Sequence, residues 1–382
     1  RSVRMGAHTM IYLDYSANTP ADAAVLEAFC QTERRYIGNP NSAHAAGLAA
    51  RAEMERVTDS IAALLGVRGE EIIYTSGASE ANNLAVKGLV QAARPMGGHI
   101  ISTPLEHSSV SGALAALQKQ GCEVELVDIK PDGTIDLAHL QRLLRQDTVL
   151  LAVCAVDSEL GTVQPIRDIA AILQGYPHCR LHVDATQAVG KTELIFNGVD
   201  TMSLAPHKFY GFNGSGLLLK KSGVALEAQI HGGGSTTPYR SGTPALGMAV
   251  SAETALRLAL GQQAQRMAHV SGLNRCLRTQ LGQYPAVRFN SPPNAVPHIL
   301  NLSVTGVKGT AFQRALSEQG VCVSVRSACA AEGAPSAAVY AVSHDRRNAL
   351  SSWRISLSHL TTHAELTEFL QAFARCYQAL VP

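Results

Sequence analysis

Short runs of β-branched and other apolar residues alternate with longer segments of helical periodicity over the first two thirds of the chain. The runs predict strands at 71–75, 99–103, 123–128, 148–156 and 180–184. The helical segments include 48–65, 79–91 and 108–119. Because the run at 148–156 is apolar on both faces, it is typical of a central strand in a parallel sheet. The alternation predicts an α/β domain with a mostly parallel sheet between two layers of helices.

The pattern changes after about residue 244. A long helix over roughly 244–264 is followed by strand-like runs at 298–304, 321–325 and 353–358, and by helical segments at 309–319 and 362–379. We therefore predict a large domain over 10–256, whose first residues can pack with the second domain, and a smaller α+β domain over 257–382. Residues 1–9 show neither an apolar period nor the apolar stretch of a signal peptide, so we expect an appended or frayed tail.

Length, charge and apolar content argue against some classes of function. The 382 residues suffice for two domains, and a charged fraction of 16% against 46% apolar residues leaves room for an oligomer interface. The net charge is +2, from 32 basic and 30 acidic residues, without blocks of like charge, so we expect no direct nucleic-acid binding. No apolar run reaches the roughly 18 residues of a membrane span, so we expect no membrane association.

Cysteine and histidine spacing gives no metal or disulfide signature. None of the eight cysteines forms a C-x-x-C pair, and without an export signal the expected compartment is the reducing cytoplasm, where the thiols are free. No carboxylate or thiolate cluster completes a metal site around His178 and His182, so we expect no metal. Residues 185–192, A-T-Q-A-V-G-K-T, lack the first glycine of a phosphate loop and do not predict a nucleotide site.

Several short polar segments follow apolar strands, and in an α/β sheet the carboxyl ends of strands form the ligand site. T-S-G-A-S-E at 75–80 joins a strand to a helix, which either offers free N–H groups to an anion or is an ordinary capped helix. Asp184 ends a strand, where its carboxylate either pairs with a protonated ring nitrogen or caps a helix.

Two cationic side chains add possible chemistry. Lys208 follows an apolar run and precedes a glycine-rich turn, where desolvation can make its amine a nucleophile; the alternative is a surface lysine. Arg354 lies within a strand pattern and needs an anionic partner, for which a carboxylate fits its planar fork.

Cys329 lies in a segment rich in Ala, Ser and Gly, beside Arg326, whose charge favours a thiolate.

Together these motifs resemble those of the cysteine desulfurases, the NifS-like members of the class V aminotransferases. The resemblance rests on Y-L-D-Y-S-A at 12–17, G-N-P at 38–40, T-S-G-A-S-E at 75–80, L-E-H at 105–107, H-V-D-A-T-Q at 182–187, H-K at 207–208, R-S-G-T at 240–243 and S-A-C at 327–329. These occur in the family's order and at its approximate spacing, and they span nearly the whole chain after the tail.

The resemblance implies a fold-type-I enzyme with pyridoxal 5′-phosphate (PLP), built as a large domain with a mostly parallel seven-stranded sheet and a smaller α+β domain. Lys208 would bind PLP as a Schiff base, Asp184 would pair with the ring nitrogen, and His107 would stack on the ring and move protons. The other cofactor contacts implied are Gln187 at the phenolic oxygen, Ala78, Ser79 and His207 at the phosphate, Thr243 at the phosphate of the neighbouring subunit, and Ser158.

The implied reaction converts L-cysteine to L-alanine. Arg354 and Asn39 would bind the substrate, and Cys329 would attack its sulfur and carry it as a persulfide to an acceptor protein. The implied assembly is a homodimer. The acceptor stays open among iron–sulfur cluster scaffolds, tRNA-thiolation proteins and other carriers.

The sequence departs from the family at several positions. Ser158 stands where the family usually has Asn, Ala205 where it has a serine that reaches the phosphate, and Arg326 where a glycine is common. The alternatives are therefore another class V PLP enzyme (a selenocysteine lyase, a β-eliminating lyase or an aminotransferase) and a diverged paralogue with a binding role. Retention of Lys208 and Asp184 speaks against the last.

Overall fold

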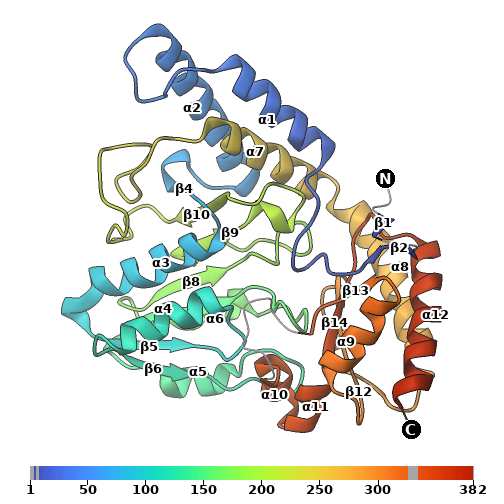
Figure 1. Cartoon of the computed structure of the whole chain (residues 1–382). Coiled ribbons are helices and arrows are strands. Elements are labelled where there is room, and N and C mark those ends of the chain that lie inside the picture. Colours follow the sequence, from blue (N-terminus) through green and yellow to red (C-terminus); the bar gives the residue numbers. More distant parts are fainter. Residues whose placement is uncertain (1–3, 6–7, 326–333, 382) are drawn as a thin grey trace.

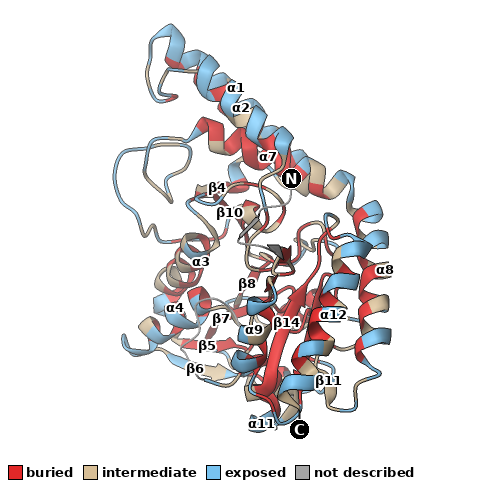
Figure 2. Cartoon of the chain, turned by 45° about the vertical axis from the view of Figure 1, so that its right-hand side comes forward, coloured by how far each residue is buried: buried red, intermediate tan, exposed pale blue. Residues whose placement is uncertain are grey.

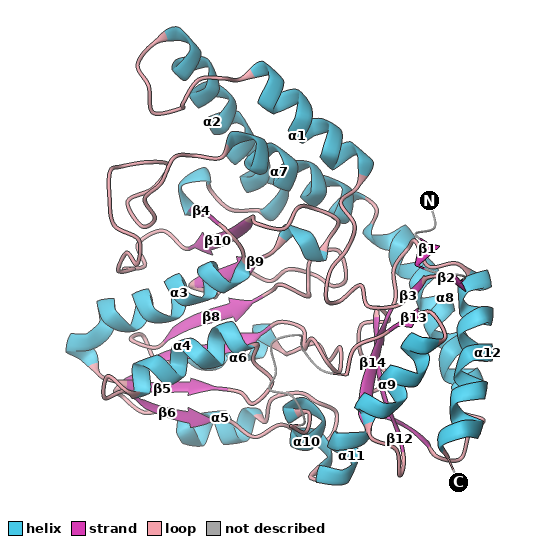
Figure 3. Ribbon diagram, in the orientation of Figure 1, coloured by secondary structure: helices cyan, strands magenta, loops and turns pink. Residues whose placement is uncertain are grey.

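The computed structural model describes residues 4–5, 8–325 and 334–381. Its centre is a seven-stranded sheet (Figures 1 and 3), which runs β4 (Ile72–Thr75), β10 (Gly216–Lys220), β9 (Thr201–Leu204), β8 (Arg180–Asp184), β7 (Thr148–Cys154), β5 (His99–Ser102) and β6 (Glu123–Leu126). Only β10 runs antiparallel to its neighbours, β4 and β9. The predicted α/β architecture with a mostly parallel seven-stranded sheet is confirmed.

Helices cover both faces of this sheet. Helices α3 (Ala78–Ala93) and α4 (Ser108–Gln118) pack on one face. The other face carries α2 (Ala45–Leu65), α5 (Leu137–Leu143), α6 (Ile166–Leu173) and α7 (Leu246–Gly261), and α1 (Ala23–Arg35) packs on α7. Successive strand residues point to opposite faces, so Ile72 and Ile73 enter different core clusters.

A second, smaller sheet forms the core of the C-terminal region. It consists of β11 (Val287–Phe289), β12 (Ile299–Val304) and β14 (Ser352–Ser356), all antiparallel. Helices α8 (Gln263–Leu281), α9 (Gly309–Glu318) and α12 (His363–Leu380) pack around it, and α10 (Ala337–Ser343) and α11 (Arg346–Ser351) follow one another beside it. Trp353 stacks on Phe312, with 5.2 Å between ring centroids, and both side chains are fully buried. Strand β14 is coloured as buried in Figure 2.

The start of the described chain lies against this smaller region. Strand β3 (Ile11–Tyr12) pairs in parallel with β13 (Val321–Cys322), and the Ser356 N–H donates to the Leu13 carbonyl at 2.7 Å. Ile11 and Leu13 belong to the smaller region's apolar core. Residues near both ends of the sequence therefore meet, which sets the position of Asp14 beside β14.

Some elements differ from the sequence prediction. The long helix predicted over 244–264 ends at Gly261, and α8 was not foreseen. The segment of β9 was noted only as an apolar run, and β10 was not predicted. The prediction of 321–325 as a strand of the smaller sheet was right only in part. Val321–Cys322 is the strand and pairs with β3, whereas Ser324 forms a single bridge to Arg354 of β14, whose edge it shares with Asp14.

Within the supposed tail, β1 (Arg4–Met5) and β2 (His8–Thr9) form a short antiparallel pair. Short 3-10 helices are η1 (Gly69–Glu71), η2 (Arg94–Met96) and η3 (Pro206–Lys208). None of the described helices combines the length and apolarity needed to cross a membrane. The described residues also contain no group of three His, Cys, Asp or Glu side chains placed to hold a metal ion. The domain boundary near residue 256 stays a prediction.

Candidate active site

A cavity of about 390 Å³ lies where the polar segments after the strands of the large sheet meet the smaller region. Most of the candidate residues line it, namely Ala78, Ser79, His107, Ser158, Asp184, Gln187, His207, Lys208 and Arg354. They come from distant parts of the sequence, and the sheet gathers them because parallel strands end at one edge. The cavity volume lies within the roughly 300–1,000 Å³ of ordinary small-molecule sites.

The start of α3 supplies backbone donors to this cavity. The first N–H to close a helical hydrogen bond is that of Ala81, which donates to the Gly77 carbonyl at 3.1 Å. The N–H groups of Ala78 and Ser79 precede it and make no bond within the helix. This helix end, together with the Ser79 hydroxyl, is therefore suited to an anion such as a phosphate.

Asp184 ends β8 and is 6% exposed. One carboxylate oxygen accepts from the Asn82 side-chain amide at 2.9 Å, and the other accepts from the Thr186 N–H at 2.9 Å. Both bonds hold the carboxylate in one orientation. A carboxylate held in one orientation at a nearly dry site is suited to pair with a protonated ring nitrogen.

His107 caps α4, and its Nδ1 accepts from the Ser109 N–H at 3.2 Å. The Ser109 hydroxyl lies 2.9 Å from the same nitrogen. Burial lowers the pKa of His107 below its usual value; the Asp184 carboxylate raises the pKa and Lys208 lowers it. The imidazole is therefore held neutral at neutral pH.

Lys208 lies in η3, directly after β9. Its Nζ donates to the carbonyls of Ser16 and Ala17, at 2.8 and 2.6 Å, so the chain start positions the amine. The turn behind it is tight, since a Cβ on Gly211 would lie 2.5 Å from the Pro206 Cβ. A side chain there would displace η3 and with it the amine.

Gln187 is 5% exposed and both ends of its amide are engaged. Its Oε1 accepts from Lys191 Nζ at 2.6 Å, and its Nε2 donates to the Ser16 carbonyl at 2.9 Å. Burial lowers the pKa of Lys191 to about 7. The NH2 group of Gln187 is therefore the end that could serve a phenolic oxygen.

His207 lines the cavity beside Lys208. Burial lowers the pKa of His207 to about 4, with further lowering by Lys208 and Lys191, so it is neutral at physiological pH. Ala205, which replaces the family's usual serine, is fully buried at the start of η3. It offers no hydroxyl to a phosphate, in agreement with the departure noted in the sequence.

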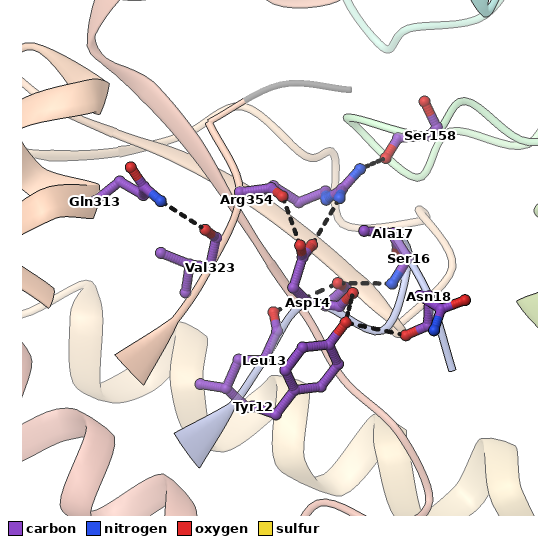
Figure 4. Close-up of polar contacts among 12 residues, drawn as sticks. Tyr12, Leu13, Asp14, Ser16, Ala17, Asn18, Ser158, Gln313, Val323 and Arg354 are labelled. Atoms are coloured by element: carbon purple, nitrogen blue, oxygen red, sulfur yellow. Dashed lines mark hydrogen bonds and ion pairs between the residues drawn. The ribbon is translucent and has the colours of Figure 1, made fainter. Parts of the chain in front are cut away.

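Arg354 in β14 connects three parts of the chain (Figure 4). Its Nη2 pairs with Asp14 Oδ1 at 2.9 Å, and its Nη1 donates to the Ser158 carbonyl at 2.6 Å. The Ser324 hydroxyl donates to the second Asp14 oxygen at 2.7 Å. Arg354 is only 3% exposed, so these partners hold its guanidinium at the cavity wall.

Three predicted site residues are not placed in the cavity. Asn39 is exposed, and its side chain accepts from the Asn41 N–H. Thr243 is exposed too and lines a neighbouring hollow, which shares Ser76 and Gly214 with the main cavity. Cys329 lies outside the described residues, as does Arg326.

Sequence reasoning missed several residues of the site. Glu106 lies between the lining residues Leu105 and His107 and is partly buried; its carboxylate accepts from the Thr103 hydroxyl at 2.8 Å and the Cys154 N–H at 2.9 Å. Burial raises the pKa of Glu106 to about 8, and it raises the pKa of the Cys154 thiol well above its usual value. The position of Glu106 within L-E-H was the available signal. Nothing in the pattern marked Cys154.

The groups of this cavity fit PLP. Lys208 offers an amine, Asp184 a carboxylate, and the start of α3 the donors for a phosphate. Two further polar atoms of the lining, Thr186 Oγ1 and Arg354 Nε, are buried and have no hydrogen-bond partner among the described residues. Buried polar atoms are rarely left unpaired in proteins, so both suit a polar ligand.

Known proteins are similar to this chain over most of its length. The model of the aminotransferase class-V family matches residues 11–369. A cysteine desulfurase IscS of Dechloromonas aromatica (strain RCB) is 37% identical over 369 residues, which cover 93% of this chain and 89% of the relative.

Solved structures agree with this match. A NifS-like protein superposes with a TM-score of 0.91 at 31% identity, over 97% of this chain and all of the other. A protein named SspA, solved in complex with cysteine, gives a TM-score of 0.80 at 30% identity, over 92% of this chain and 99% of the other. The likeness therefore extends over both regions of the molecule.

Proposed function

Because the chain belongs to the aminotransferase class-V family, whose members use PLP, we propose that it is a PLP-dependent cysteine desulfurase. It converts L-cysteine to L-alanine and passes the sulfur to an acceptor protein. Relatives at this level of identity are named cysteine desulfurases, and SspA was solved with cysteine bound. One observation carries the proposal: an amine, a carboxylate, a neutral imidazole and a guanidinium line one cavity, from Lys208, Asp184, His107 and Arg354.

When bound, PLP supplies an electron sink conjugated to the amino group of the substrate. Lys208 would hold the cofactor covalently, and Asp184 would keep its ring nitrogen protonated. The first turn of α3, with Ala78 and Ser79, would bind the phosphate. His107 would move protons above the ring, and Arg354 would bind the carboxylate of the substrate.

Cys329 would carry out the transfer of sulfur from the substrate. In the proposed reaction its thiolate attacks the sulfur of the substrate, an S–S bond forms and the Cβ–S bond breaks. The electron pair of the broken bond stays with Cβ, which takes up a proton to give alanine. In net terms, a protein thiol and cysteine give a protein persulfide and alanine, so no external oxidant is needed.

We further propose a cytoplasmic homodimer in which Thr243 of each subunit reaches the phosphate site of the other. Thr243 is exposed on the single chain and lies beside the cavity without lining it. Three apolar side chains near the start of the chain are also exposed: Leu26 lies in α1, Ile37 follows the end of α1, and Leu48 lies in α2. A monomer by light scattering at micromolar concentration, with full activity, would contradict this assembly.

The function is tested by supplying the purified chain with PLP and L-cysteine and measuring alanine and sulfide. We expect equal amounts of both with a reductant present, and no turnover by Lys208→Ala. Lys221→Ala, which changes an exposed lysine, is the matched control. Pyruvate and ammonia in place of alanine would instead indicate a β-eliminating lyase, and turnover of selenocysteine alone a selenocysteine lyase.

The role of Cys329 has its own test. Cys329→Ala should retain bound PLP and bind cysteine but form neither persulfide nor sulfide. Cys322→Ala is the control, because Cys322 lies in β13 and burial raises the pKa of its thiol. Turnover of Cys329→Ala at the parent rate would remove the main support for the sulfur step.

A further inference from the structure

One buried side-chain amide joins Asp184 to Ser109, whose side chain in turn contacts His107. Asn82 lies in α3 and is completely buried. Its Nδ2 donates both hydrogens, one to Asp184 Oδ2 at 2.9 Å and one to the Ser109 hydroxyl at 2.9 Å. Asp184 and the neighbour of His107 are thus held by a single NH2 group.

The direction of the Asn82 amide follows from its partners. The Asp184 carboxylate can only accept, so the end of the amide that faces it must be the NH2 group. Oδ1 then faces His182 Nε2, at 3.0 Å, and also accepts from the Ser203 hydroxyl. His182 must therefore carry a hydrogen on Nε2, and all partners of the amide agree with one orientation.

The donor and acceptor roles at Asn82 also determine the direction of the hydrogen bond between Ser109 and His107. The Ser109 oxygen accepts from Asn82, so its own hydrogen is available for His107 Nδ1, 2.9 Å away. The Ser109 backbone N–H, which can only donate, points at the same nitrogen from 3.2 Å. Two donors at Nδ1 require an unprotonated nitrogen there.

We propose that Asn82 and Ser109 are positioning residues that hold His107 in the tautomer with its hydrogen on Nε2, and that they link this tautomer by hydrogen bonds to the Asp184 carboxylate. His107 then faces the cavity as a neutral hydrogen-bond donor through Nε2. Charging the ring would place a hydrogen on Nδ1 against the fixed Ser109 N–H. The network therefore also opposes the imidazolium form, in line with the lowered pKa of His107.

The tautomer is a property of the folded chain, and only its use in catalysis rests on the proposed function. It can be read by nitrogen-15 NMR at pH 7.5 on the full chain with labelled histidine, with and without PLP and without cysteine. The His107 signals are those lost in His107→Ala. We expect a protonated Nε2 and an unprotonated Nδ1.

Ser109→Ala removes the hydroxyl donor and leaves the N–H. We expect a mixture of tautomers and a kcat lowered about fivefold, the effect of one lost hydrogen bond, with KM for cysteine within about twofold. Ser109→Thr keeps a hydroxyl and should restore both values. Asn82→Leu, which removes both donors, should shift the tautomers further and also weaken PLP binding through Asp184.

Ser102→Ala is the matched control, because its buried hydroxyl donates to the Ala152 carbonyl at 2.9 Å and does not reach the network. Thermal melting checks that each variant is folded. A wild-type His107 with its hydrogen on Nδ1 would overturn the proposal. So would Ser109→Ala and Asn82→Leu variants whose tautomers match those of the control. Failure to turn over cysteine, with the expected tautomer, would instead count against the proposed function alone.

Discussion

The cavity has two halves that are built differently. The cofactor half, formed by the start of α3, His107, Asp184 and Lys208, comes entirely from the large sheet and its helices. The carboxylate half, formed by Arg354, Asp14 and Ser158, joins the chain start, the smaller sheet and a loop of the large region.

The difference lies in charge and in connectivity. The cofactor half is held mainly by directed hydrogen bonds, to the Asp184 carboxylate and from Lys208 Nζ to backbone carbonyls, with His107 and His207 both neutral. The carboxylate half depends on an ion pair between residues 340 positions apart. Substitutions in the first half should therefore alter the chemical step, and those in the second should alter substrate affinity and the docking of the two regions.

The largest expected effect is in the cofactor half. His107→Ala should lower kcat about 10²–10⁴-fold, the usual contribution of a general acid or base, while PLP binding and the melting temperature stay close to the parent. Steady-state kinetics and a PLP titration measure this. His178→Ala, at an exposed histidine, is the control. An unchanged kcat would show that His107 moves no proton in the slow step.

Arg354→Gln should act mainly on substrate affinity and on stability. It leaves the Asp14 carboxylate without its cationic partner, which costs about 3–5 kcal/mol for a buried pair, and kcat/KM should fall at least 100-fold through KM. Arg278→Gln removes another part-buried arginine, far from the cavity, and controls for stability. A normal KM in Arg354→Gln would separate this half from substrate binding.

Glu106 predicts a pH dependence of stability in the cofactor half. Its folded pKa, about 8, lies above its unfolded value, so the folded state retains a proton that the unfolded state releases. This contribution to stability is complete below the unfolded pKa and is lost as pH rises through about 8. Relative to Glu106→Gln, the parent should therefore lose about 2 kcal/mol of unfolding free energy between pH 6 and pH 8.

Denaturant unfolding at several pH values measures this difference, and Glu55→Gln, at an exposed glutamate, should show none. Parallel pH profiles for the parent and Glu106→Gln would indicate that Glu106 is ionised in the folded protein.

The smallest expected effect concerns the support of Asp14. Ser324→Ala removes one hydrogen bond to a carboxylate that keeps its arginine partner, so KM for cysteine should rise only about two- to tenfold with kcat unchanged. Ser222→Ala removes a comparable serine–carboxylate bond at the surface, to Glu70, and should leave KM unchanged. A change in kcat in place of KM would place Ser324 with the cofactor half.

The sequence alone was sufficient for the fold class and for most of the cavity lining. Apolar period and strand-end position are local properties, so the central strands, Asp184, Lys208 and the start of α3 could be read from short segments. Strands β9 and β10 were missed because a glycine-rich turn follows the first and their apolar runs are short.

Only the tertiary structure decided which partners these side chains have. No local pattern indicates that Asp14 pairs with Arg354, that Asn82 bridges Asp184 and Ser109, or that Val321 and Cys322 pair with β3. These contacts join residues that are distant in sequence, and they form because burial makes an unpaired polar group costly, so each such group bonds with whatever the fold brings near it. The sequence therefore determined the chemical groups of the site, and the packing of the two regions determined their charge, orientation and protonation.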